Sequence, residues 1–139
     1  MLIFSYPENS HTEDYRQEVL NLVNAQRAKY GLTALEMGDD ALTAAAQTRA
    51  EEISVVNSHV RPDGSKCFTV LKDYGVTDTP TGENAAWGSV SPEEVVNAWM
   101  NSEGHRANIL NPEARKMSVG YYYNSNSTWG HQWIQIFTK

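Results

Sequence analysis

The chain has little cysteine, no long apolar run and a deficit of positive charge. Cys67 is the only cysteine, so no disulfide can form within the chain, and cysteine content gives no indication of its compartment. No window approaches a membrane span, and the first residues lack the basic region and long apolar core of a signal peptide. We therefore expect a soluble chain as given, which could still be the mature part of an exported precursor.

The charge balance disfavours two classes of partner. The formal net charge is -6 at pH 7, so DNA, RNA or an anionic membrane surface is repelled on average. No internal repeat or low-complexity tract interrupts the 139 residues. This length predicts one globular domain that buries enough surface to fold without cross-links.

The first predicted helix spans about residues 12–30 and follows an SxxE capping signature. We assign residues 1–11 to a flexible N-terminal segment and residues 12–139 to a single domain. The polar face of the helix has two interpretations. It is a solvated surface, or Asn24 and Arg27 on it make buried polar contacts.

A second helix follows a linker over residues 31–38 and is predicted to end near Val56. Asp39 or Asp40 provides its N-cap. One stripe of the helix is rich in alanine, which implies close packing. The stripe consists of Leu42, Ala45, Ala46, Arg49, Ala50 and Ile53.

A short third helix over residues 68–74 leads into a polar loop and then the segment GENAAWG. Glu83 lies at the edge of this loop, beside a short apolar run. A carboxylate in that place is solvated, paired or functional. His59 begins another polar segment, NSHVRPDGS, where it is either a hydrogen-bonding residue or a ligand.

The most strongly specified helix begins at Ser91, with Pro92 at its first position and Glu94 completing an SxxE capping box. Its apolar face packs inward and fixes the polar turn that follows. In that turn Glu103 and His105 are separated by one glycine. They form either a satisfied polar turn or a pair that converges on a proton, a metal ion or a polar ligand.

Residues 119–123 and 129–137 alternate at strand period around a polar turn, which predicts an antiparallel hairpin. Both faces of the returning strand carry apolar side chains, so both are expected to be covered. Helices first and a hairpin last indicate an α+β fold, with a small sheet between helical layers.

Two other side chains could carry chemistry. Cys67 falls in the apolar register of the short helix beside Phe68, which favours a buried inert thiol over a nucleophile paired with His59. His131 lies on the returning strand in register with Trp133, and strand alternation does not select the layer that it faces.

Six segments occur in one order between about Tyr15 and Phe137: NAQRAKYGLTAL, SHVRPDGS, GENAAWG, VVNAWMNSEGHRANILNP, SVGYYY and WIQIF. Together they resemble the CAP superfamily of cysteine-rich secretory proteins, antigen 5 and pathogenesis-related class 1 proteins. The chain is most similar to the short bacterial branch, whose members usually lack disulfides and are commonly exported. The resemblance implies an extracellular or cell-surface location.

The resemblance also implies an α-β-α sandwich with a small central antiparallel sheet and a cavity where histidines and acidic residues meet. His59 matches the histidine of HxRPDG, Glu83 the glutamate of GEN, and His105 the histidine of the GH motif. In many relatives a second acidic residue lies three positions after the tryptophan, where this chain has Ser102. Glu103, one residue later, either fills that place through a local shift, as we expect, or points to solvent.

We favour an extracellular binding or interaction module that acts as a monomer on a lipid, a peptide or a cell-surface component. Its cavity holds a divalent metal ion or a polar ligand. Zinc is the expected metal, because the neutral imidazoles of His59 and His105 are suitable zinc ligands. A metal-free pocket, in which Glu83 and Glu103 hold the two histidines by hydrogen bonds, is also compatible with the sequence.

The alternative function is a metal-dependent, peptidase-like hydrolase that uses the same cavity. Glu83 or Glu103 would then activate a metal-bound water as general base. The sequence contains no HExxH helix, no GxSxG elbow and no Ser-His-Asp signature. It leaves open whether the chain is an enzyme.

Overall fold

The computed structural model describes the backbone of residues 5–139 and the side chains of residues 12–139. Helices and strands alternate irregularly along this part of the chain. The elements are α1 (Ser5–Lys29), β1 (Glu36–Met37), α2 (Asp40–Ile53), α3 (Thr69–Asp73), β2 (Pro80–Trp87), α4 (Pro92–Met100), α5 (Glu103–Ile109), β3 (Lys116–Tyr123) and β4 (His131–Thr138). None of the helices within residues 5–139 is both long enough and apolar enough to cross a membrane.

The strands form one sheet in the order β1-β3-β4-β2. β4 pairs antiparallel with β3 and with β2, which confirms the predicted hairpin and the antiparallel centre of the sheet. The short β1 pairs parallel with β3 and lies in the segment predicted as a linker. Its strand character comes from the backbone N–H groups of Glu36 and Gly38, which donate to carbonyls at and just before β3. β2 is an edge strand.

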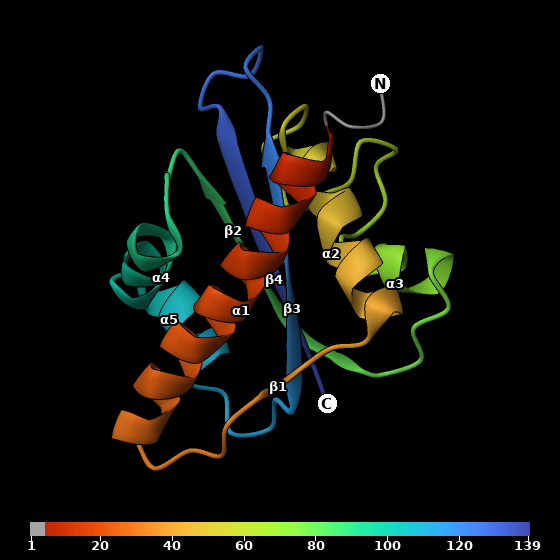
Figure 1. The fold of residues 1–139 in the computed structure, drawn as a ribbon. Helices are drawn as coiled ribbons and strands as arrows, with labels where there is room; N and C mark the ends of the chain where they lie inside the picture. Colours follow the sequence, from red (N-terminus) through yellow and green to blue (C-terminus); the bar gives the residue numbers. More distant parts are fainter. Residues whose placement is uncertain (1–4) are drawn as a thin grey trace.

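Helices cover both faces of the sheet, and this arrangement confirms the predicted α-β-α sandwich. Figure 1 shows α2 and α3 on one side of the strands and α1, α4 and α5 on the other. Successive residues of β4 divide between the two cores. Trp133 and Phe137 pack with α1 and α4, whereas Ile134 and Ile136 pack with α2 and α3.

Two predicted helix caps are confirmed, because short-range capping depends only on local sequence. The Asp39 carboxylate accepts from the backbone N–H of Leu42 at 3.0 Å. The Ser91 hydroxyl accepts from the N–H of Glu94 at 3.2 Å. The far end of α2 was predicted near Val56, but the helix ends at Ile53.

The start of α1 differs from the prediction. The helix begins at Ser5 instead of about residue 12. Pro7 is compatible with this start, since N–H groups in the first turn of a helix have no intrahelical acceptor. The flexibility of segment 1–11 stays a prediction, and residues 1–4 lie outside the described part of the chain.

The polar face of α1 is partly buried, as the second of its two interpretations predicted. Arg27 is fully buried, and its Nη1 donates to the carbonyls of Ile109 at 2.8 Å and Asn111 at 2.9 Å. Asn24 exchanges two hydrogen bonds with the main chain of Leu35. Arg27 thereby fixes the end of α5 against α1.

The alanine-rich stripe of α2 lies very close to β3. A Cβ atom built on Gly120 would lie 2.1 Å from the carbonyl oxygen of Ala46, so only a hydrogen atom fits there. The helix backbone can approach the sheet this closely because the facing side chains are small.

We expect Gly120→Ala to destabilise the protein by about 1–3 kcal/mol, because the added methyl group meets backbone that cannot rotate away. Gly104→Ala is the matched control: the space around this exposed helix position is open. The control should unfold at the same urea concentration as the parent or at a higher one. Urea unfolding followed by tryptophan fluorescence measures both, and equal midpoints for parent and Gly120→Ala would contradict this packing.

Candidate functional site

Glu83 lies within β2 and not at the edge of a loop. Its backbone is paired with Ile136 of β4. The segment GENAA contains no β-branched or aromatic residue, so its sequence carries little strand signal. Pairing with β4 decides its conformation.

The carboxylate of Glu83 is held by Arg49 of α2. Nε donates to Oε2 at 2.8 Å and Nη2 donates to Oε1 at 3.0 Å. The side chains are 0% and 1% exposed, so this is a buried, bidentate ion pair. The sequence places Arg49 in the alanine-rich stripe of α2 and assigns it no role. An arginine among leucine, alanine and isoleucine was the signal, because a buried guanidinium needs a partner.

The same carboxylate orients His59. Nδ1 of the ring lies 2.9 Å from Oε1 of Glu83, and because an ionised carboxylate only accepts, Nδ1 carries the hydrogen. In the neutral ring Nε2 then holds the free lone pair. The side chain is 55% exposed. His59 therefore presents a ligand atom or proton acceptor to its surroundings while Glu83 fixes the ring.

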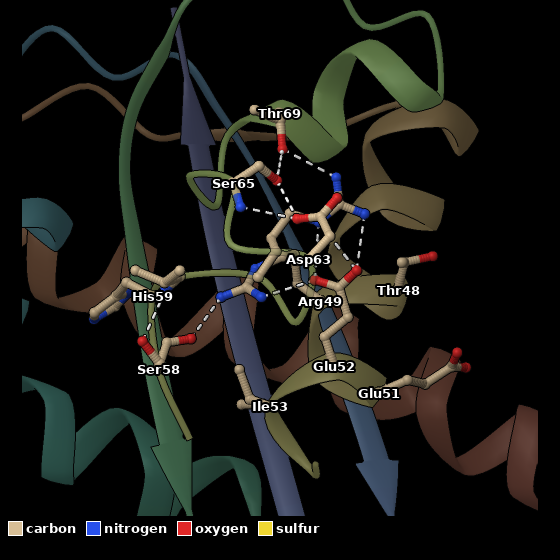
Figure 2. Close-up of polar contacts among 12 residues, drawn as sticks. Thr48, Arg49, Glu51, Glu52, Ile53, Ser58, His59, Asp63, Ser65 and Thr69 are labelled. Atoms are coloured by element: carbon tan, nitrogen blue, oxygen red, sulfur yellow. Dashed lines mark hydrogen bonds and ion pairs between the residues drawn. The ribbon is translucent and has the colours of Figure 1, made fainter. Parts of the chain in front are cut away.

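Arg49 also holds the backbone next to this ring. Its Nη2 donates to the carbonyl of Ser58 at 3.0 Å, and its Nη1 donates to Glu52 at 2.8 Å (Figure 2). The guanidinium of Arg49 thus contacts both the Glu83 carboxylate, which orients His59, and Ser58, which precedes His59. The position of His59 depends on α2.

The arginine of the HxRPDG motif continues this network. Arg61 donates to both oxygens of Glu52 and, at 2.8 Å, to Asp73 at the end of α3. Carboxylates and guanidiniums therefore alternate from Glu83 through Arg49, Glu52 and Arg61 to Asp73. The alternation ties the His59 loop to α2 and α3 and pairs the buried charges within it.

The segment that carries His105 is helix α5, where the sequence predicted a polar turn. α5 begins directly after Ser102 and buries Ile109, so tertiary packing makes this short segment helical. Asn84 of β2 donates to the carbonyl of His105 at 3.1 Å and accepts from Asn108 at 2.8 Å. α5 is thereby docked on β2 one residue from Glu83.

Gly82 permits this docking. A Cβ atom at Gly82 would lie 2.5 Å from Oδ1 of Asn108. The glycine of the GEN motif therefore lets α5 approach the edge strand closely. His105 comes from the α4 and α5 layer and is bonded through its carbonyl to Asn84, whereas His59 comes from the α2 and α3 layer and is bonded to Glu83, the preceding residue of β2.

The two histidines have opposite electrostatic environments. The hydrogen bond to Glu83 raises the pKa of His59 above its usual value, against the effects of burial and of Arg49. Burial, and then the positive charge of His59, lower the pKa of His105. Nδ1 of His105 is buried and has no hydrogen-bond partner among the described residues. His105 is therefore neutral at neutral pH and close enough to His59 to respond to its charge.

Burial by itself would raise the pKa of Glu83. The hydrogen bonds from His59 and Arg49, together with the charge of Arg49, outweigh burial and hold the pKa below its usual value. Glu83 is ionised at neutral pH, and its oxygens are engaged by these donors.

Glu103 is exposed in the first turn of α5. Within residues 12–139, its side chain makes no hydrogen bond or ion pair with His59, Glu83 or His105. Its participation in the site stays a prediction. Two hollows, of about 290 and 480 Å³, lie elsewhere, between α1 and α2 and beside Arg115. A closed cavity at the two histidines also stays a prediction.

Cys67 lies beside the same carboxylate. A ring nitrogen of His59, Sγ of Cys67 and a carboxylate oxygen of Glu83 are all within 4.8 Å of one another. The predicted burial of Cys67 is confirmed. Burial, and then the negative charge of Glu83, raise the pKa of the thiol to about 11, so it is protonated at neutral pH. No pattern in the sequence indicates that Cys67 and Glu83 are neighbours.

His131 faces the α1 layer at the other end of β2. Its Nδ1 is hydrogen-bonded to the hydroxyl of Tyr121 at 2.7 Å, and its ring also contacts Tyr123. The backbone carbonyl of His131 accepts from Gly88, which follows β2. His131 thus supports the aromatic packing of the hairpin.

We expect Glu83→Gln to lower the pKa of His59, because the raised value depends on the hydrogen bond to an ionised carboxylate. NMR titration of the imidazole protons measures this pKa directly. Glu113→Gln removes an exposed carboxylate that is bonded to Lys139 and does not act on His59, and it should leave the pKa of His59 unchanged. An unchanged His59 pKa in Glu83→Gln would show that the carboxylate does not hold the ring in solution.

We expect Arg49→Met to destabilise the protein by about 3–5 kcal/mol at pH 7, because it leaves a buried carboxylate without its partner. Glu83 has a lowered folded-state pKa, so its stabilising contribution is present above the unfolded value of about 4.3 and is lost as pH falls below it. The difference from the parent should shrink over that acidic range. Urea unfolding at a series of pH values tests this, and a difference independent of pH would contradict it.

Comparison with known sequences identifies a family. The profile described as "CAP: Cysteine-rich secretory protein family" matches residues 20–137. YkwD of Bacillus subtilis (strain 168) is 41% identical over 127 residues, which cover 90% of this chain and 49% of YkwD. The chain thus spans about half the length of this relative.

Solved structures agree with this match. An extracellular protein containing a SCP domain from Bacillus anthracis superposes with a TM-score of 0.80 at 25% identity, over 92% of this chain and 41% of that one. An outer surface protein of Borrelia burgdorferi gives a TM-score of 0.70 at 26% identity, over 86% of this chain and 88% of that one. The order of motifs, the sandwich and these matches together show that the chain belongs to the cysteine-rich secretory protein, or CAP, family.

Proposed function

We propose that the chain is an extracellular, monomeric binding module in which His59 and His105 together hold one divalent cation, with zinc preferred, or a polar ligand in its place. The observation that carries the proposal is the orientation of His59. Glu83 accepts from Nδ1, and this leaves the lone pair of Nε2 for a ligand. The extracellular location is supported by the extracellular and outer-surface neighbours.

The donor set fits zinc. Two neutral imidazoles are typical zinc ligands, and the lowered pKa of His105 keeps its lone pair available at neutral pH. A carboxylate that orients a ligating histidine is the usual outer-shell partner in such sites. A bound zinc ion would have positions left for water or for a polar group of a partner molecule. That partner is a lipid, a peptide or a cell-surface component.

Glu83 is assigned the role of an orienting residue. Arg49 donates to both of its oxygens and His59 donates to one of them, so three of the four lone pairs of the carboxylate are engaged and its lowered pKa makes it a weak base. This disfavours Glu83 as the general base of a hydrolase. Glu103 is exposed, and no contact with the other site residues positions it within the described part of the chain. Binding without turnover therefore fits the site better than hydrolysis.

We expect calorimetric titration of the metal-free protein at neutral pH to show one zinc ion bound per chain. His59→Ala and His105→Ala should each abolish the binding. His131→Ala is the matched control, since it removes a histidine at the opposite end of β2, and it should bind zinc as the parent does.

Zinc binding should weaken as pH falls, because protons compete for the ring nitrogens. The raised pKa of His59 predicts that this weakening begins above about pH 6.5. Undiminished binding by both histidine variants would place the site elsewhere. No binding by the parent would reject the metal and leave the polar ligand.

A further inference from the structure

The thiol of Cys67 does not lie in a purely apolar environment. It belongs to the segment before α3, and its neighbours at Sγ are the imidazole of His59 and the carboxylate of Glu83, all within 4.8 Å. A thiol that only fills space in a core needs neither neighbour. Sulfur, nitrogen and oxygen donors from three separate segments converge here.

We propose that Cys67, His59 and Glu83 form a second metal site, which takes soft, thiophilic divalent ions such as cadmium. The ion would bind Sγ, the Nδ1 lone pair and one carboxylate oxygen. The S–H bond breaks, a sulfur–metal bond forms, and the thiol proton passes to solvent. The hydrogen on Nδ1 is replaced by one on Nε2, so each ion bound releases one proton.

The geometry requires only a modest adjustment. Two donors around a tetrahedral metal ion lie about 3.5 Å apart when each is about 2.0–2.3 Å from it, as for zinc. Nδ1 of His59 and Oε1 of Glu83 are 2.9 Å apart and already lie within that spacing. Sγ of Cys67 must approach them by about an ångström at most. His59 can supply the movement, since it lies in a loop and its side chain is 55% exposed.

The charges around the site select the class of ion. Arg49 shares both oxygens of Glu83, so its positive charge opposes any cation placed there. A bound thiolate adds the negative charge that compensates for this repulsion. Magnesium and calcium prefer several oxygen ligands and gain little from sulfur, so they should not bind. The site is therefore specific for ions that bind thiolate.

This site shares His59 with the proposed function but does not need His105. A neutral imidazole has one free lone pair. On Nε2 it binds the ion shared with His105, and on Nδ1 it binds the ion shared with Cys67. The two modes therefore exclude each other within one chain. A variant of His105 and a variant of Cys67 separate them.

Cadmium titration followed by ultraviolet absorption tests the proposal, because a sulfur–cadmium bond gives a charge-transfer band. We expect the parent to develop this band up to one equivalent per chain, with no effect of added magnesium or calcium. His105→Ala should keep the band. Cys67→Ser should lose the band. Its cadmium affinity should fall by about tenfold or more, because loss of a residue that only supports a metal ligand already costs about that much.

A parent without the band, or a Cys67→Ser variant with unchanged cadmium affinity, would overturn the site. If Cys67→Ser does not fold, the parent alone gives the answer. Saturating cadmium should then protect Cys67 from a thiol reagent, whereas saturating magnesium should not. Equal reaction rates with and without cadmium would also overturn the proposal. In His105→Ala, retention of the cadmium band would support the Cys67 site. Loss of zinc binding in the same variant bears on the proposed function, so the two proposals are tested separately.

Discussion

The buried pair of Arg49 and Glu83 is the interaction on which the candidate site depends. A charge out of water is stable only when it is paired and hydrogen-bonded, so each side chain fixes the other. Arg49 thereby joins α2 to β2 and also holds the backbone before His59. Glu83 in turn orients the imidazole. A single ion pair thus determines where the ring lies and which of its nitrogens is free.

The free edge of β2 explains why the site lies where it does. A strand inside the sheet would separate the two helical layers, but beyond an edge strand their side chains can meet. α5 approaches this edge because Gly82 has no side chain and because Asn84 and Asn108 bond across the contact. His105 is then linked to β2 from one layer and His59 from the other.

The single free lone pair of His59 links the two proposed metal sites. Hydrogen-bonded to Glu83, the ring offers Nε2 toward a ligand shared with His105. When the hydrogen moves to Nε2, the free lone pair lies on Nδ1 and can bind a thiophilic ion beside Cys67. The chain spans about half of YkwD, so this relative also contains sequence outside the matched domain.

The sequence by itself determined the helix caps at Asp39 and Ser91, the hairpin and the family motifs that carry His59, Glu83 and His105. These features are encoded by residues a few positions apart or by ordered motifs, so no three-dimensional information was needed. The strand character of β2, the helix α5 and the partner of Glu83 were decided by tertiary structure. Arg49 and Glu83 are 34 positions apart, and no local pattern couples them. Only packing α2 against the sheet buries both charges together and makes their pairing obligatory.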